Sequence, residues 1–488
     1  MRAGTLLESD GVPDLRFYNT LARQVEPFAP LEPGKVRMYH CGPTVYQRPH
    51  VGNYRAFLFA DLLRRVLEQR GFQVTQVMNL TDVGHIQGDA DAGEDKLEAE
   101  ARKRRIDPWE LTRRVAEQFF ADLRALQVRP AHHYPRATDH IPEMVAMVEK
   151  LLQRGCAYQV GHNVYFDVSR FPEYGKLSGN RVQDLEAGAR LEINPEKRHP
   201  ADFALWKSDP AHIMKWATAL GPNGFPGWHI ECSAMSRKYL GETFDIHTGG
   251  EDNVFPHHEC EIAQSEGATG KPFVKLWMHT KFLMVDGGKM AKSLGNVYTL
   301  DDIAARGFSP LDLRFFILRS HYRGSLNFTW EALAGAAEAR KSLCDFKGRL
   351  AAEFNRIIGY DPNQWSPVVA ATREAFQVAI NDDLNASAAL ASVFELRNRY
   401  LRGQLEPSEF RWAEVFLAEV DDLFTFLEAG HSGPDFTSDQ VERLLQERAL
   451  ARQQKDFKKS DAIRAQLASA GIVIEDSSSG TRWHRGGI

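Results

Sequence analysis

The sequence predicts an α/β protein in which a parallel-sheet domain carries an insertion and is followed by a helical bundle and a small C-terminal module. Three observations predict this architecture. Two stretches rich in β-forming residues, 36–40 and 72–80, flank a segment with helical periodicity. The pattern then becomes helical from about residue 310 to nearly 430. A second helical stretch, 438–470, precedes a short strand at 472–474.

The first of these features is a strand–helix–strand unit. Between its strands, apolar side chains recur with the helical period, and Gly71 follows as a helix terminator. The recurring side chains are Ala56, Phe57, Phe59, Leu62, Leu63, Val66 and Leu67. Two strands joined through a helix run parallel, because antiparallel neighbours need only a hairpin. The unit therefore predicts a parallel sheet.

The remaining elements divide the chain. An amphipathic helix is predicted at 114–128, and the stretch 160–225 is rich in glycine, proline and charge, with one predicted strand at 164–168. Residues 431–434 form a predicted linker. The predicted regions are two halves of the sheet domain (1–130 and 226–280), an insertion (131–225), a connecting region (281–340), a helical bundle (341–430) and a terminal module (431–488).

Composition excludes several classes of protein. The chain has 488 residues with 43% hydrophobic side chains and a net charge of −5, which is ordinary for a globular protein. Five cysteines are too few for a disulfide framework, so we expect a reducing, cytoplasmic location. The N-terminus lacks the apolar core of a signal peptide, and no stretch is long and apolar enough for a membrane span. Mild acidity does not exclude a nucleic-acid partner, because local basic patches decide that.

Cys41, Cys232, His257 and Glu261 are candidate ligands of one metal ion. His257 and Glu261 are four residues apart in Pro256-His257-His258-Glu259-Cys260-Glu261, and on a helix they would share a face. A set with two thiolates suits zinc better than magnesium or calcium. The spacing fits equally well with two buried cysteines acting as small hydrophobic residues and a hydrogen-bonded histidine.

The segment Pro49-His50-Val51-Gly52-Asn53 begins the predicted crossover helix. A helix N-terminus attracts phosphate, Gly52 permits close approach of a ligand, and His50 and Asn53 can donate hydrogen bonds. The alternative is a surface loop with capping residues.

Two more segments are candidate nucleotide contacts. Lys289-Met290-Ala291-Lys292-Ser293 follows two glycines and places two cations where they could clamp a polyanion. Gly249 and Gly250 follow a predicted strand and precede Asp252, an arrangement that suits packing against a nucleoside. Each segment alone also fits an ordinary turn. Neither GxxxxGK[ST] nor GxGxxG occurs in the chain.

Together and in this order, these motifs resemble the cysteinyl-tRNA synthetases, a family of class I aminoacyl-tRNA synthetases. Pro49–Asn53 is similar to the HIGH element and Lys289–Ser293 to the KMSKS element. The blocks 227–235, 255–265 and 380–390 also resemble the family, so that the likeness covers essentially the whole chain. The chain departs from the pattern at Asn53, where HIGH ends in histidine, and at Ala291, where KMSKS has its first serine. The polar loop at 82–95 has no predicted role.

The resemblance implies a Rossmann-type catalytic domain that activates L-cysteine with ATP and transfers it to tRNA(Cys). It implies zinc held by Cys41, Cys232, His257 and Glu261, and Mg²⁺ accompanying ATP. The residues implied around the cysteine are Thr81, Trp228 and His247. Those implied around ATP are His50, Gly52, Gly249, Gly250, Asp252 and Lys292, and the implied catalytic residues are His50, Asn53, Lys289 and Lys292. The expected state is a monomer.

The resemblance also assigns the regions. Residues 281–340 would carry the KMSKS loop and contact the tRNA stem, 341–430 would be a tRNA-binding bundle, and 431–488 would read the anticodon. In the last region, Asp476 and Trp483 are the predicted anticodon contacts, because a carboxylate can accept from a base edge and an aromatic ring can stack on a base. The segment 448–464 before them contains six basic and two acidic residues: Arg448, Arg452, Lys455, Lys458, Lys459 and Arg464 against Asp456 and Asp461.

Two alternatives share some of these motifs. One is a cysteine-activating ligase that acts on a small amine, as in mycothiol synthesis, but such an enzyme would not need residues 340–488. The other is a non-catalytic zinc- or RNA-binding relative, which would be expected to lose His50 or the two lysines that this chain retains.

Overall fold

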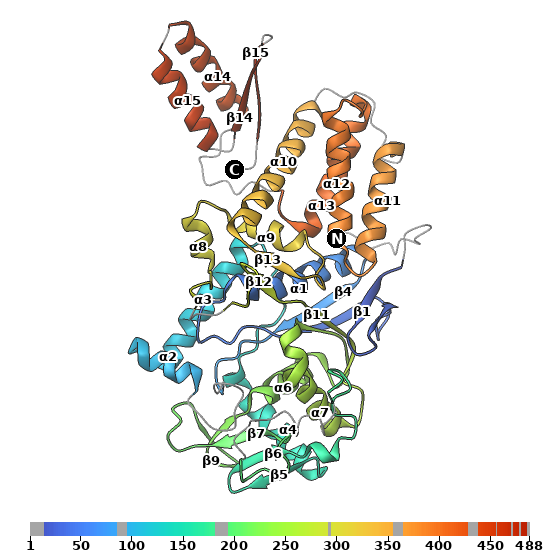
Figure 1. Ribbon diagram of the computed structural model, residues 1–488, viewed down its shortest axis with the longest axis vertical. Helices are drawn as coiled ribbons and strands as arrows, with labels where there is room; N and C mark the ends of the chain where they lie inside the picture. The colour runs from blue at the N-terminus through green and yellow to red at the C-terminus, as the bar shows by residue number, and fades with distance from the viewer. Residues whose placement is uncertain are drawn as a thin grey trace.

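A computed structural model describes residues 14–84, 95–180, 194–290, 294–354, 365–427, 438–454, 456–469, 472–477 and 480–485 (Figure 1). The predicted contacts Ala291, Lys292 and Ser293 lie outside these residues, as does most of the polar loop at 82–95.

A parallel sheet of four strands forms the centre of the predicted sheet domain, which confirms the predicted fold class. Its strand order is β11 (Val274–Thr280), β10 (Phe244–Gly250), β3 (Lys35–His40) and β4 (Gln73–Met78). Every neighbouring pair runs parallel. Because β10 pairs with β3, a segment more than 200 residues away in sequence lies in the middle of the sheet, beside the first strand. The hairpin of β1 (Arg16–Asn19) and β2 (Gln24–Pro27) was not predicted from the sequence.

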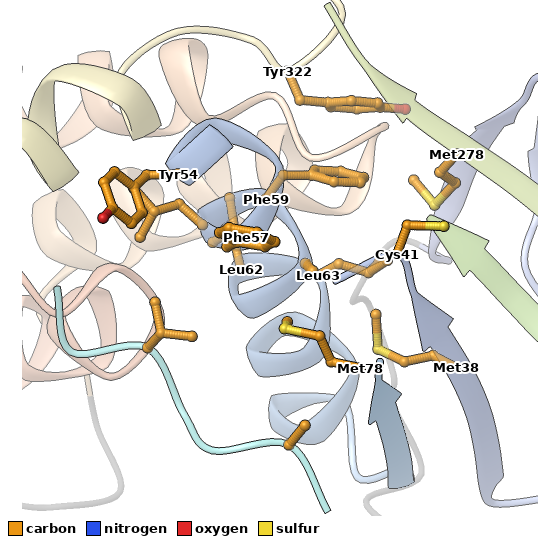
Figure 2. Close-up of a cluster of buried hydrophobic side chains, with 14 of the residues drawn as sticks. Met38, Cys41, Tyr54, Phe57, Phe59, Leu62, Leu63, Met78, Met278 and Tyr322 are labelled. Carbon is orange, nitrogen blue, oxygen red and sulfur yellow. The ribbon is translucent and has the colours of Figure 1, made fainter. Parts of the chain in front are cut away.

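Helix α1 (Val51–Gln69) is the predicted crossover between β3 and β4. Its apolar face is buried against the sheet, where Phe57 and Leu63 belong to the same cluster as Met38, Met78 and Met278 (Figure 2). Burying a side chain of this size contributes about 1.5–3 kcal/mol. This packing fixes the helix against the sheet and so fixes the position of its N-terminus.

The insertion has a sheet of its own. Five antiparallel strands lie in the order β5 (Ala157–Val160), β6 (Asn163–Phe166), β7 (Phe203–Ser208), β9 (Gly221–Pro226) and β8 (Trp216–Thr218). Helix α4 (Ile141–Gln153) precedes it, and α6 (Trp228–Leu240) returns the chain to the parallel sheet. In Figure 1 these strands lie at the opposite end of the molecule from the helical bundle.

Two helices, α2 (Lys96–Arg104) and α3 (Pro108–Ala125), follow β4. The prediction of a helix at 114–128 placed its start too late. The helix begins at Pro108, because the Asp107 side chain accepts hydrogen bonds from the Trp109 and Glu110 N–H groups.

After β11 the chain forms the pair β12 (Leu283–Val285) and β13 (Leu326–Phe328), with α8 (Leu300–Ala305) and α9 (Pro310–Leu318) between them. The predicted bundle consists of α10 (Trp330–Phe354), α11 (Pro367–Asn381), α12 (Ala386–Leu401) and α13 (Phe410–Phe424). In the described part of the chain, no helix is long and apolar enough to cross a membrane.

The C-terminal module contains α14 (Ser438–Gln453), α15 (Phe457–Ser469) and the antiparallel pair β14 (Ile472–Ser477) and β15 (Gly480–Arg485). Its apolar side chains form a cluster separate from the main core, made of Val441, Leu445, Ile463, Leu467, Ile472 and Ile474. The module therefore packs around a core of its own.

A buried ion pair joins the sheet domain to the helical bundle. Arg314 on α9 and Asp61 on α1 are 0% and 1% exposed, and the Arg314 Nη2 atom lies 2.7 Å from Asp61 Oδ2. Arg314 also donates to the carbonyl oxygens of Leu126 and Phe424, and Asp61 accepts from Arg65 and from the Arg129 N–H. The pair thus connects α1, α9, the end of α13 and the segment after α3.

We expect Arg314→Ala to lower the free energy of unfolding by about 3 kcal/mol, because it leaves the buried Asp61 with one cation fewer. The shift of the urea midpoint measures this loss. Arg113→Ala is the matched control, since its ion pairs with Glu110 and Glu117 are exposed and screened by solvent, so its loss should shift the urea midpoint far less. Equal shifts for the two variants would contradict the assigned importance of the buried pair.

Candidate active site

The candidate site lies where the carboxyl ends of the parallel strands meet. Cys41 directly follows β3, and its N–H donates to the Thr248 carbonyl of β10 at 3.2 Å. Thr81 comes three residues after β4 and exchanges backbone hydrogen bonds with Pro43 and Val45. Ligands of open α/β sheets bind at this edge.

The predicted metal ligands come together here. Cys41, Cys232, His257 and Glu261 each offer one ligand atom, and these atoms all lie within 4.8 Å of one another. Glu261 Oε1 is 3.1 Å from His257 Nε2 and 3.9 Å from Cys41 Sγ. Cys232 is on α6, while Glu261 is on α7 (Glu259–Thr269). His257 ends a π-helical turn, Val254–His258, that runs directly into α7, and its side chain meets that of Glu261 four residues on, as the spacing predicted.

A second set shares two of these residues. Cys41, His247, His258 and Glu261 also place one ligand atom each within 4.8 Å of one another. His258 Nε2 is 3.1 Å from Cys41 Sγ, and His247 Nε2 is 3.0 Å from Glu261 Oε2. Sequence reasoning missed His258, although its position next to His257 was a signal. The first set has two thiols and is the softer donor set, so it fits zinc better.

Burial makes both sets suitable for a cation. Loss of hydration raises the pKa of the Cys41 thiol and of the Glu261 carboxyl well above their ordinary values, and it lowers the pKa of His247 to about 3. Acidic groups without a compensating cation are expensive to bury in ionised form. A divalent ion would remove that cost and hold the thiols as thiolates.

Two residues of the predicted phosphate-binding motif, His50 and Asn53, cap the N-terminus of α1. His50 is the N-cap of α1, and its N–H donates to Asn53 Oδ1 at 3.0 Å, so Asn53 closes a capping box. At Gly52 the helix N-terminus packs closely against Met290, since a Cβ there would lie 2.1 Å from Met290 Cε. The contact brings the start of the Lys289–Ser293 segment against this helix N-terminus. Lys289 itself lies 6.0 Å from the centre of the Phe282 ring.

Gly249 and Gly250 are the last residues of β10, whereas the sequence suggested that they follow the strand. A Cβ on Gly250 would lie 2.3 Å from Asp252 Oδ1, and one on Gly249 would lie 2.8 Å from His258 Cε1. Burial raises the pKa of Asp252. The absence of side chains on the two glycines lets Asp252 and His258 pack closely against this strand end, beside the candidate metal ligands.

The three residues predicted around the amino acid adjoin the metal set. Trp228 begins α6 and stacks on His257 with ring centres 4.3 Å apart. His247 contacts Glu261 and stacks on Trp277. The Thr81 hydroxyl donates to Glu231 at 2.9 Å. Sequence reasoning did not single out Glu231, although it lies next to Cys232 in the quoted block 227–235.

The two predicted anticodon contacts lie in the C-terminal hairpin. Asp476 is in β14, and nothing is described of its side chain. Trp483 is in β15, where its indole N–H donates to Glu442 at 2.7 Å and its ring packs against the module's own core. The hydrogen bond fixes the indole, so that stacking on a base would have to use the part of the ring that the core leaves uncovered.

Fold and site define a class I aminoacyl-tRNA synthetase. Residues 27–338 match the family described as tRNA synthetases class I (C) catalytic domain, and residues 434–483 match the cysteinyl-tRNA ligase anticodon binding domain. A cysteine–tRNA ligase of Thermus thermophilus is 45% identical over 486 residues, which cover 96% of this chain and 99% of that protein. The chain therefore belongs to the cysteine–tRNA ligase family.

Other comparisons agree. A cysteine–tRNA ligase of Chlorobaculum tepidum is 43% identical over 491 residues and covers the same shares of both chains. A solved structure of Mycobacterium tuberculosis methionyl-tRNA synthetase in complex with methionyl-adenylate superposes with a TM-score of 0.60 over 80% of this chain and 92% of that chain. At 14% identity this last likeness shows the fold alone.

We expect purified protein to carry about one zinc per chain. Cys232→Ser should lower the zinc content well below half, because it removes one of the two soft donors. The control is Cys344→Ser, since Cys344 is a buried thiol whose neighbours are the carbonyl oxygens of Phe426 and Leu427. Metal analysis by mass spectrometry gives the result. Full zinc content in Cys232→Ser and its loss in His258→Gln would assign the ion to the second set instead.

Proposed function

We propose that this protein activates L-cysteine with ATP to cysteinyl-adenylate, releasing pyrophosphate, and transfers the cysteinyl group to the 3′ end of tRNA(Cys). The observation that carries the proposal is the buried set Cys41, Cys232, His257 and Glu261, in a chain of the cysteine–tRNA ligase family that also has the candidate phosphate-binding N-terminus of α1.

The metal set would select the substrate by its thiol. Serine differs from cysteine mainly by oxygen in place of sulfur, a difference that an ordinary pocket discriminates poorly. Zinc binds a thiolate far better than a hydroxyl and lowers the pKa of a thiol. Trp228 walls the pocket by stacking on His257, and burial of Glu261 and Cys232 excludes water from the ligand atoms.

The triphosphate would bind between two motifs. On one side, His50, Gly52 and the N–H groups of α1 would face the phosphates. The side-chain oxygen of Asn53, Oδ1, already accepts a hydrogen bond from the His50 N–H at the helix start. The side-chain amide nitrogen of Asn53 is therefore the group that would donate to a phosphate. On the other side we place Lys289 and Lys292. Their part is to stabilise charge on the departing pyrophosphate, with no proton transfer required of them. Gly249, Gly250 and Asp252 would receive the nucleoside, and Mg²⁺ would accompany ATP.

The C-terminal module would bind the anticodon, with Asp476 and Trp483 as contacts and the exposed Arg452, Lys458, Lys459 and Arg464 on the phosphates; Arg448, in contrast, is buried in the module. All the candidate active-site residues come from one chain, so a monomer is sufficient for activity. We assign the protein to the cytoplasm, where tRNA charging takes place.

The two alternatives make different predictions. A ligase for a small amine would activate cysteine but leave tRNA uncharged, and a non-catalytic relative would do neither. The match of 434–483 to an anticodon binding domain favours the tRNA ligase. Cysteine-dependent ATP–pyrophosphate exchange, measured together with charging of tRNA(Cys), decides among the three. Exchange without charging would contradict the proposed function, as would the absence of both in zinc-loaded protein.

We expect deletion of 431–488 to leave ATP–pyrophosphate exchange nearly intact and to weaken tRNA charging by roughly tenfold or more. The deletion removes a module with its own core, and the described activation residues all precede it. Charging by the truncated protein should also depend less on salt, because phosphate contacts are lost. Equal loss of both activities in a folded, zinc-loaded truncation would show that the module supports the catalytic fold.

A further inference from the structure

His212 of the insertion contacts the start of α2 through both nitrogens of its ring. It lies in the loop between β7 and β8 and is 7% exposed. Its Nδ1 atom is 3.1 Å from Glu98 Oε1, and its Nε2 atom is 3.5 Å from Asp95 Oδ2. Both carboxylates are buried as well, at 6% and 4% exposure. This histidine between two buried carboxylates has no part in the proposed function.

The hydrogens on the His212 ring can be assigned from its partners. Nδ1 also lies 2.9 Å from the Met214 carbonyl oxygen, which can only accept, so Nδ1 carries a hydrogen. In a neutral ring, Nε2 would then turn a lone pair towards the Asp95 carboxylate. Nε2 and Asp95 Oδ2 are both buried and have no hydrogen-bond partner among the described residues. A hydrogen on Nε2 would lie between the two atoms and remove this conflict, so the geometry favours the charged ring.

Backbone hydrogen bonds favour the ionised form of both carboxylates. Asp95 Oδ1 caps α2 by accepting from the Leu97 and Glu98 N–H groups at 2.7 and 3.1 Å. Glu98 Oε1 accepts from the Ile213 and Met214 N–H groups at 2.6 and 3.2 Å. Donors of this kind stabilise a carboxylate against protonation. The loop therefore meets α2 through a positive ring between two negative groups.

The surroundings of His212 support the charged ring. Burial by itself lowers the pKa of His212, but Asp95, Glu98 and the Met214 carbonyl outweigh it and raise the pKa above its ordinary value. Phe225 of β9 stacks on the ring with centres 3.9 Å apart, and the sequence of β9 contains no charged residue.

Other charged groups on the neighbouring elements do not replace these carboxylates. On the histidine's own loop, Lys215 donates to the Pro210 carbonyl oxygen, and Asp209 accepts from the Ala211 N–H. On α2, Lys96 follows Asp95 in the chain. On α6, Glu231 lies within electrostatic range of Asp95.

We propose that His212, Asp95 and Glu98 form a pH-sensitive contact, which holds the loop between β7 and β8 against α2 while His212 is protonated and releases it when the proton is lost. A histidine whose pKa is raised by folding stabilises the folded contact fully below its ordinary pKa of about 6.5. That stabilisation is lost as the pH rises through the raised pKa. The inference does not depend on the proposed function, because none of the three residues belongs to the candidate active site.

The first test measures the pKa of individual histidines in the full-length protein. Exchange of the histidine C2 hydrogen with deuterium, followed by mass spectrometry of peptides over a range of pH, gives these values. We expect His212 to titrate at higher pH than His162, an exposed histidine of the same insertion. Asp95→Asn keeps a side-chain oxygen to cap α2 but removes the charge facing Nε2, so it should lower the pKa of His212 and leave that of His162 unchanged. Equal pKa values for the two histidines, or no change in Asp95→Asn, would overturn the inference.

The second test measures the release of the loop. Backbone amide exchange of a peptide containing Ile213 and Met214 is followed from mildly acidic to mildly alkaline pH, with exchange times corrected for the intrinsic effect of pH. We expect protection in the parent protein to fall by about tenfold or more over this range. In His212→Gln, which stays neutral, protection should not depend on pH, whereas the control His162→Gln should behave as the parent does.

Asp95→Asn covers the case in which His212→Gln does not fold, because it should also lose most of the pH dependence. Protection that is independent of pH in the parent would show a static structural contact and would overturn the inference. The parent's pH dependence surviving in His212→Gln or in Asp95→Asn would overturn it as well.

Discussion

The parallel pairing of β10 with β3 is the constraint on which the candidate site depends. Because the two strands run in the same direction, Cys41 at the end of β3 meets His247 and Gly249 at the end of β10. The pairing of β3 with β4 then brings Thr81 to the same edge. An antiparallel sheet would have sent alternate strand ends to opposite edges. Residues from separate parts of the chain therefore share one site without any long connecting loop.

The molecule holds two kinds of buried polar cluster, and their contrast separates stability from function. Asp61 is matched by donors on Arg65, Arg129 and Arg314, so its charge is compensated within the chain. Cys41 and Glu261 instead contact each other and histidines, and burial raises the pKa of both. In the first cluster, the buried charge is balanced by groups of the chain itself, and the cluster connects domains. The second is incomplete without a cation, as is expected of a site that binds one.

Periodicity was enough to predict the parallel sheet, the crossover helix, the bundle and the terminal module, because each rests on a regular burial pattern. Capping chemistry set boundaries that periodicity missed, as at Asp107 before α3. The candidate metal ligands Cys232 and His257 were recognisable from their motifs. Glu231 and His258 were not singled out, because their significance depends on what lies opposite them: the Thr81 hydroxyl after β4, and the Cys41 thiol after β3. Such pairings across more than 100 residues leave no periodic trace in a single sequence.

Helix α1, which begins at the candidate phosphate-binding motif, also positions the bundle. Near its start, Arg55 is buried and donates to the carbonyl oxygens of Phe282 and Tyr322 at 2.7 and 3.2 Å. Phe59 on the same helix stacks on Tyr322 (Figure 2), whose hydroxyl donates at 2.5 Å to Asp383 between α11 and α12. One buried network therefore joins α1 to the bundle. The same network joins α1 to the start of β12, the strand that precedes the Lys289–Ser293 segment. Because packed and hydrogen-bonded elements move together, this network fixes the position of the bundle relative to the N-terminus of α1.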